Sequence, residues 1–169
     1  MANIFVISDT HFGHANMLGF VGLAGAPVRS FSSVEAMDEH IVDRWNATVR
    51  SQDHVYHLGD VAMRKDGLAV VKRLNGHKRL VPGNHDIFDV RDYLACGFQK
   101  VFGMRVLDNW LMTHIPVHPE SLGRFRGNVH GHIHERACYP GRYINVSVEA
   151  VNYTPVALES LRAPTEPER

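Results

Sequence analysis

The sequence predicts a single α/β domain in which parallel strands alternate with helices and are followed by shorter strands. Three observations predict it: a length suited to one core, an apolar run near the N-terminus, and alternating strand-like and helix-like segments. The chain has 169 residues, 44% hydrophobic and 21% charged, as in ordinary globular proteins. We expect residues 1–162 to form one domain, and residues 163–169, which hold two prolines, to be a flexible tail.

The first half of the chain contains three candidate strands separated by helices. Residues 3–8 form a continuous β-branched and aromatic run, which is typical of a strand buried on both faces. Apolar residues that recur every four positions after Ser33 predict a helix there. Ser33 itself is a residue type that can cap the start of this helix. Residues 53–58 and 78–81 predict two further strands, with a modest helix over 68–74 between them. This order is typical of a layered fold with parallel strands.

The second half predicts short strands joined by tight turns. The expected strands cover residues 101–102, 104–107, 109–113, 128–130, 142–147 and 155–158. Turns at Gly103 and at residues 108–109 shorten the connections, and short connections favour antiparallel pairing.

Charge and cysteine content narrow the class of protein. Lys and Arg number 18, as do Asp and Glu, so no basic field predicts binding to a polynucleotide or an anionic membrane. Cys96 and Cys138 are too few for a disulfide framework and indicate two thiols in a reducing cytoplasm. The N-terminus lacks signal-peptide features, and the apolar run at 4–7 is too short to span a membrane. We therefore expect a cytoplasmic protein without a membrane partner, and its oligomeric state stays open.

Ionisable and amide side chains follow the predicted strands, and the chain holds 12 histidines, a high number for its length. The groups in these positions are Asp9, His11, Asp60, Asn84, His85, His114, His132 and His134. Because the carboxyl ends of parallel strands share one edge of a sheet, we expect these side chains to converge there.

The chemistry of this set predicts a metal centre. Carboxylates, imidazoles and an amide oxygen, without thiolate, suit Mn, Fe, Zn, Co, Ni or Mg. A single structural zinc ion needs only four ligands, fewer than are present. Two cations about 3.5–4 Å apart, bridged by a carboxylate and a hydroxide, use the set more fully. One isolated Asp or His after a strand is most often a turn residue or a helix cap, so the prediction depends on the whole set.

Five sequence blocks occur in the order typical of calcineurin-like metallophosphoesterases. The blocks are Asp9-Thr10-His11, Gly59-Asp60, Gly83-Asn84-His85-Asp86, His114 and Gly131-His132-Ile133-His134. The chain most resembles the small single-domain bacterial and phage members, whose ending is similar to Asn145-Val146-Ser147-Val148-Glu149. The resemblance implies an α/β fold, a two-sheet mixed β-sandwich flanked by helices.

The resemblance also implies two divalent metal ions, with manganese as the first choice and Fe, Zn, Ni, Co or Mg as alternatives. The implied ligands are Asp9, His11 and His134 for the first ion, Asn84, His114 and His132 for the second, and Asp60 as a bridge between both. Metal binding lowers the pKa of a water from 15.7 toward ~7, which supplies hydroxide at neutral pH.

The implied activity is hydrolysis of a phosphate ester through attack by metal-bound hydroxide. His85 would be the general acid that protonates the leaving group, and Asp86 would orient its ring. Without a large insertion to form a cap, the site should be open, which favours a phosphodiester of the cyclic or linear nucleotide type over a phosphomonoester. We consider His14, Asn16, His118 and Arg29 as candidate substrate-binding residues, because they lie near the blocks or can bind phosphate.

Two other functions stay open. A nuclease acting on polynucleotide is disfavoured by the neutral charge and the lack of a basic or aromatic tract. A catalytically inactive protein-binding scaffold of the same fold is disfavoured by the presence of His85, because such proteins typically lack the leaving-group histidine.

Overall fold

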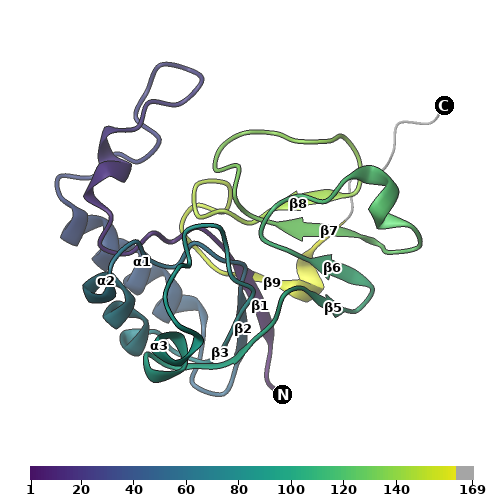
Figure 1. The fold of residues 1–169 in the computed structure, drawn as a ribbon, viewed down its shortest axis with the longest axis horizontal. Coiled ribbons are helices and arrows are strands. Elements are labelled where there is room, and N and C mark those ends of the chain that lie inside the picture. Colours follow the sequence, from purple (N-terminus) through teal and green to yellow (C-terminus); the bar gives the residue numbers. More distant parts are fainter. Residues whose placement is uncertain (163–169) are drawn as a thin grey trace.

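The computed structural model describes residues 1–162, and the expected tail at residues 163–169 lies outside them. Figure 1 shows helices on one side of the molecule and a second sheet on the other, with a first sheet between them. The helices are α1 (Val34–Thr48), α2 (Lys65–Ala69) and α3 (Val90–Ala95). Short 3₁₀ helices are η1 (Ala15–Gly19), η2 (Val70–Arg73), η3 (Pro119–Leu122) and η4 (Leu158–Ser160).

The first sheet has five strands in the order β4-β3-β2-β1-β9. Its strands are β1 (Ile4–Ile7), β2 (His54–His57), β3 (His77–Leu80), β4 (Phe98–Val101) and β9 (Val156–Ala157). Strands β1 to β4 are parallel and β9 pairs antiparallel with β1. The parallel arrangement predicted for the first half of the chain is therefore confirmed.

The second sheet has four strands in the order β5-β6-β7-β8. Its strands are β5 (Arg105–Leu107), β6 (Trp110–Met112), β7 (Gly127–His130) and β8 (Tyr143–Asn145). Only β5 and β6 pair antiparallel; β6, β7 and β8 are parallel, so the expected antiparallel pairing is wrong for most of this sheet. The segments between these strands are long enough for parallel crossovers, which need a dozen or so residues.

Two apolar clusters hold the three layers together. Phe5 and Ile7 of β1 face the helices and pack with Trp45, whereas Val6 faces the second sheet and packs with Trp110. Burial of alternate residues on both faces explains why the first strand is apolar throughout. Within residues 1–162, the helices lack the length and apolar character needed to cross a membrane.

The helix start at Ser33 follows the prediction. Ser33 lies before the first turn of α1, and its Oγ accepts a hydrogen bond from Ala36 N at 3.2 Å. The modest helix expected over 68–74 is instead a short α-helix from Lys65 followed by a 3₁₀ turn.

Candidate metal centre

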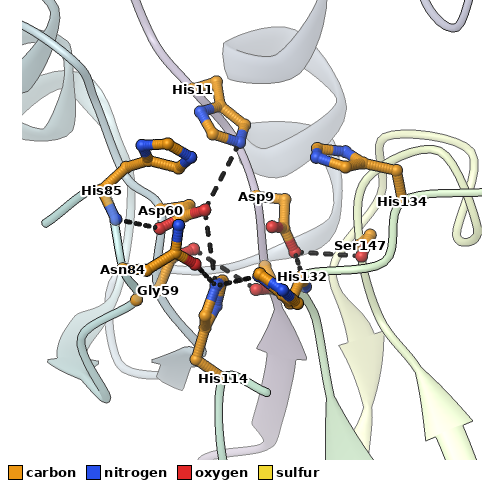
Figure 2. Close-up of polar contacts among 12 residues, drawn as sticks. Asp9, His11, Gly59, Asp60, Asn84, His85, His114, His132, His134 and Ser147 are labelled. Carbon is orange, nitrogen blue, oxygen red and sulfur yellow. Dashed lines mark hydrogen bonds and ion pairs between the residues drawn. The ribbon is translucent and has the colours of Figure 1, made fainter. Parts of the chain in front are cut away.

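The predicted ligands converge at the carboxyl ends of the strands, where the two sheets meet. Asp9 and His11 follow β1, Asp60 follows β2, and Asn84 follows β3. The side chains from the second sheet come from the segments after β6 and β7, namely His114, His132 and His134. An isolated parallel bridge between Ser8 and Ser147 joins the two sheets at this edge. Figure 2 shows these side chains pointing toward one another.

Two groups of candidate ligands form this centre. Asp9, His11 and His134 make one group, and Asp60, His114 and His132 make the other; each residue of a group offers a ligand atom within 4.8 Å of the others. The carboxylate of Asp60 lies near both groups, because its Oδ2 is 3.4 Å from His114 Nε2 and 3.7 Å from His11 Nε2.

Backbone conformation sets these side chains apart from ordinary loop residues. Asp9, His11, Asp60, His132 and His134 all have φ between 49° and 73°. This left-handed region is sparsely occupied by residues other than glycine and costs roughly 1–3 kcal/mol at each position. Backbone strain gathered at converging polar side chains is typical of functional sites.

Buried polar atoms without a hydrogen-bond partner are the first test of whether these residues suit a cation. Asp9 Oδ1 and both ring nitrogens of His11 have no partner within residues 1–162. The other oxygen of Asp9 accepts from His132 N and from Ser147 Oγ, each at 2.9 Å. Leaving the first oxygen and the imidazole unpaired in the interior is costly, and a divalent cation would satisfy both.

Converging acceptors are the second test. His114 Nδ1 lies 2.7 Å from the carbonyl of Leu58, to which it can donate, which leaves Nε2 as the atom that can bind a cation when the ring is neutral. That Nε2 lies 3.0 Å from Asn84 Oδ1, which accepts, and 3.2 Å from His132 Nδ1, which accepts in one of its two neutral tautomers. Acceptors that face one another favour a shared cation, and the residues therefore fit metal ligation.

The electrostatics of the centre are dominated by burial. Burial, together with the nearby charge of Arg29, lowers the pKa of His11 to about 2. Burial raises the pKa of Asp9. For Asp60, burial works in the same direction, but hydrogen bonding and the charge of His114 outweigh it and lower the pKa to about 2. The site therefore offers a neutral imidazole and an ionised carboxylate, which are the ligand forms that metals bind.

The carboxylate of Asp86 bonds backbone groups on the turns after β2 and β3. Its carboxylate accepts hydrogen bonds from the backbone N–H groups of Asp60 at 2.7 Å, Gly83 at 2.8 Å and Val61 at 3.0 Å. Tyr93 Oη donates to it at 3.3 Å. Asp86 therefore fixes the two turns that present Asp60 and His85, and it does not bond the ring of His85.

Arg29, a candidate substrate-binding residue, is buried in the structure. This side chain is 1% exposed, and its guanidinium donates to Glu149 Oε1 and to the carbonyls of Asp9 and Thr10. Its nitrogens therefore support the turn after β1 by hydrogen bonds. They do not face the solvent, from which a phosphate would enter.

The other candidate substrate-binding residues differ in position. The His14 ring lies with its centroid 5.6 Å from that of His11, at the border of the centre. Asn16 is exposed on η1. His118 is exposed, caps η3 through Nδ1 and contacts the ring of Tyr139 in the segment between β7 and β8, so these contacts are not with the two ligand groups.

Two residues at the site had no predicted role. Glu149 accepts a hydrogen bond from His134 Nδ1 at 3.0 Å, which orients that ring with Nε2 toward the centre. Ser147 donates to Asp9. Both belong to the segment after β8, and this strand-end position was the signal that could have identified them.

The fold and the site together define the class: a two-sheet α/β protein with two Asp–His groups suited to divalent cations at the edge where its sheets meet. No protein-family model matches the chain. It belongs to the family of uncharacterized protein MJ1445 from Methanocaldococcus jannaschii, to which it is 33% identical over 174 residues, covering 94% of this chain and 89% of that protein.

Solved structures agree with the fold. A protein of unknown function from Aquifex aeolicus, AQ665, superimposes with a TM-score of 0.73 and 25% identity over 94% of this chain and 97% of that chain. The nuclease MPE of Pseudomonas putida has a TM-score of 0.51 and 24% identity, over 78% of this chain and 61% of that chain. The predicted fold, a two-sheet mixed sandwich flanked by helices, is confirmed.

Proposed function

We propose that this protein is a calcineurin-like metallophosphoesterase that uses two divalent metal ions to hydrolyse phosphate esters. The observation that supports it most strongly is the pair of Asp–His groups that adjoin at Asp60, with left-handed backbone at most of the ligands. The nuclease MPE of Pseudomonas putida shares the fold, which agrees with phosphoester chemistry.

The proposed metal ligands are those that the resemblance implies. Asp9, His11 and His134 would hold the first ion, Asn84, His114 and His132 would hold the second, and Asp60 would contact both. Two cations would supply Lewis acidity, which withdraws charge from a phosphoryl group and lowers the pKa of a water. Manganese is the proposed metal, with Fe, Zn, Ni, Co and Mg as alternatives that share these ligand types.

His85 is the proposed general acid. Its ring centroid lies 5.6 Å from that of His11, at the border of the two groups, and the side chain is partly exposed. Its backbone N–H donates to Asp60 Oδ1 at 2.9 Å, so the carboxylate proposed to hold the metals also positions the acid. From this position beside His11, the imidazole can protonate the leaving oxygen of an ester that enters from solvent.

The proposed substrate is a phosphodiester of the cyclic or linear nucleotide type, in preference to a monoester. Asn84 is exposed and His85, His132 and His134 are partly exposed, so an ester that projects from solvent can reach the centre. A diester carries a single negative charge and has substituents on both sides, which an open edge accommodates.

The test compares release of p-nitrophenol from bis-p-nitrophenyl phosphate and p-nitrophenyl phosphate by manganese-loaded protein. We expect the diester to be cleaved faster, and Asp60→Asn to lose both metal binding and turnover. Retention of both by Asp60→Asn would exclude the bridged centre. Failure to cleave either ester with two metal ions bound would instead favour a protein-binding scaffold.

The role of His85 is tested with a poor leaving group. We expect His85→Ala to lose roughly 10²–10⁴-fold in rate on a dinucleotide, whose leaving alkoxide needs a proton, and much less on p-nitrophenyl esters. His77→Ala is the matched control, because His77 begins β3 at the end opposite Asn84. Equal losses on both ester types would rule out the acid role.

Polynucleotide is the second candidate substrate, because the Pseudomonas putida protein of the same fold is a nuclease. The equal numbers of acidic and basic residues argue against it, since polynucleotide binding depends on neutralising phosphates. Cleavage of single-stranded DNA that weakens steeply with added salt would favour this candidate over small diesters.

A further inference from the structure

A cavity of about 380 Å³ adjoins the centre on the side of His134. Met17, Phe20, Val21 and Leu23 form its apolar wall, and Glu135 and Arg136 lie on the wall with His134. The volume is within the range of small-molecule sites, which are mostly apolar with a few polar groups that fix orientation. The proposed function assigns this space no role.

Apart from Met17 of η1, the apolar wall belongs to a hairpin that projects from the body of the protein, visible as the dark purple and blue loop that follows η1 in Figure 1. Val21 and Pro27 form an antiparallel bridge, and Val28 N donates to Phe20 O at 2.8 Å. Phe20 is 50% exposed, Val21 66% and Leu23 83%. A concentration of large apolar side chains at a solvent-facing cavity typically marks a binding surface.

The cavity is continuous with the proposed metal ligands. His134 belongs to both, since it lines the cavity and lies in the group with Asp9 and His11. A second link runs through His14, whose ring lies near that of His11 and meets Phe20 edge to face at 6.2 Å.

The position of the cavity relative to His85 indicates which substituent of a diester, the leaving one or the retained one, would lie in it. The rings of His85 and His134 flank that of His11, with centroid distances of 5.6 Å and 5.4 Å, and Figure 2 shows them on opposite sides of the centre. In the proposed reaction the group that His85 protonates departs on the side of His85, and the attacking oxygen enters in line behind it. A substituent that points toward His134 is not the departing group, so it is one that stays on phosphorus.

We propose that this cavity binds an aromatic substituent, such as a nucleobase or an aryl group, on the part of the diester that is retained on phosphorus. Phe20, Val21 and Leu23 are its specificity-determining residues. This inference rests on the proposed function, and it narrows the substrate class to diesters with a flat apolar group on the retained side.

The test keeps the leaving group constant and varies the retained one. Manganese-loaded protein is given p-nitrophenyl phenyl phosphate and methyl p-nitrophenyl phosphate, which both release p-nitrophenol. We expect kcat/KM to favour the phenyl ester by roughly 10-fold or more, and Phe20→Ala and Leu23→Ser to remove most of that preference. Val106→Ser on β5 is the control, because it removes an exposed apolar side chain from the second sheet and should keep the preference.

Binding separates this inference from the proposed activity. The affinities of phenylphosphonate and methylphosphonate for the same variants are measured by calorimetry. A preference for the phenyl compound that depends on Phe20 supports the cavity even if neither ester is cleaved. Cleavage of both esters with equal kcat/KM, or a preference unchanged in Phe20→Ala and Leu23→Ser, overturns the inference and leaves the activity standing. A dimer that Leu23→Ser converts to monomer without a change in preference also overturns it.

Discussion

Gly83 lies so close to Asp60 and His114 that this position has no room for a side chain. A β-carbon here would lie 2.7 Å from Asp60 N and 2.8 Å from His114 Cε1, distances that real β-carbons essentially never show. The neighbours cannot withdraw without moving the proposed bridging carboxylate. The glycine before Asn84 is therefore a condition for the geometry of the centre.

We predict that Gly83→Ala weakens manganese binding at least tenfold and destabilises the protein by about 1–3 kcal/mol, the usual cost of overpacking a tight site. Gly103→Ala is the matched control, because a β-carbon at Gly103 would meet no atom within 4 Å. Calorimetric titration with Mn²⁺ and urea unfolding measure the two effects. Normal metal binding by Gly83→Ala would mean that the close packing does not control the ligands.

Residue type and strand-end position were enough to predict which side chains gather at the centre, but not what each side chain contacts. Arg29 has a guanidinium, a group that binds phosphate in many proteins. Here the side chain is buried, and the guanidinium donates a hydrogen bond to Glu149 instead. Asp86 follows His85 in sequence but bonds to backbone on another turn. Such partners depend on contacts between distant parts of the chain, which local sequence patterns do not encode.

At the scale of elements, the sequence predicted best those segments with a strong periodic or continuous apolar pattern. The strand β1 and the helix α1 belong to this class. By contrast, α3 is only six residues long, too short for a period to be recognised. The strand expected at residues 101–102 overlaps the end of β4, which has two exposed residues and lies at the edge of the first sheet. It pairs parallel with β3, so the antiparallel pairing expected there was wrong, because pairing partners are set by the whole sheet.

The start of α1 supplies a prediction at this scale. Ser33→Ala removes the side-chain acceptor for Ala36 N, and we expect a loss of about 1 kcal/mol in the free energy of unfolding. Ser32→Ala is the control, because Ser32 is exposed and lies one residue before the cap. Urea unfolding of both variants measures the difference. Equal effects of the two substitutions would show that the cap contributes nothing to stability.

At the scale of the whole molecule, the centre lies where the two sheets meet. One apolar cluster joins the helices to the first sheet, and another joins the first sheet to the second. Each ligand group draws on both sheets: Asp9 and His11 follow β1 whereas His134 follows β7, and Asp60 follows β2 whereas His114 follows β6. Metal ions bound there would connect the layers in the folded state, and the unfolded chain has no such arrangement.

We therefore predict that metal binding stabilises the entire domain. A cation at 100 times its Kd that binds only the folded state adds about 2.7 kcal/mol, which corresponds to a rise in Tm of roughly 5–11 °C for a chain of this size. Thermal unfolding with Mn²⁺, and again after removal of metal with EDTA, measures the change in Tm.

Asp60→Asn tests whether this stabilisation comes from the centre. We expect the variant to lose most of the rise in Tm, because the carboxylate adjoining both groups is gone. Asp108→Asn is the matched control, since Asp108 lies in the turn between β5 and β6 and should keep the full rise. If Mn²⁺ raised the Tm of Asp60→Asn as much as that of the parent, the stabilising ions would be bound elsewhere. If it raised neither, the Asp–His groups would not hold manganese, and the link between the two sheets would depend on their apolar contacts alone.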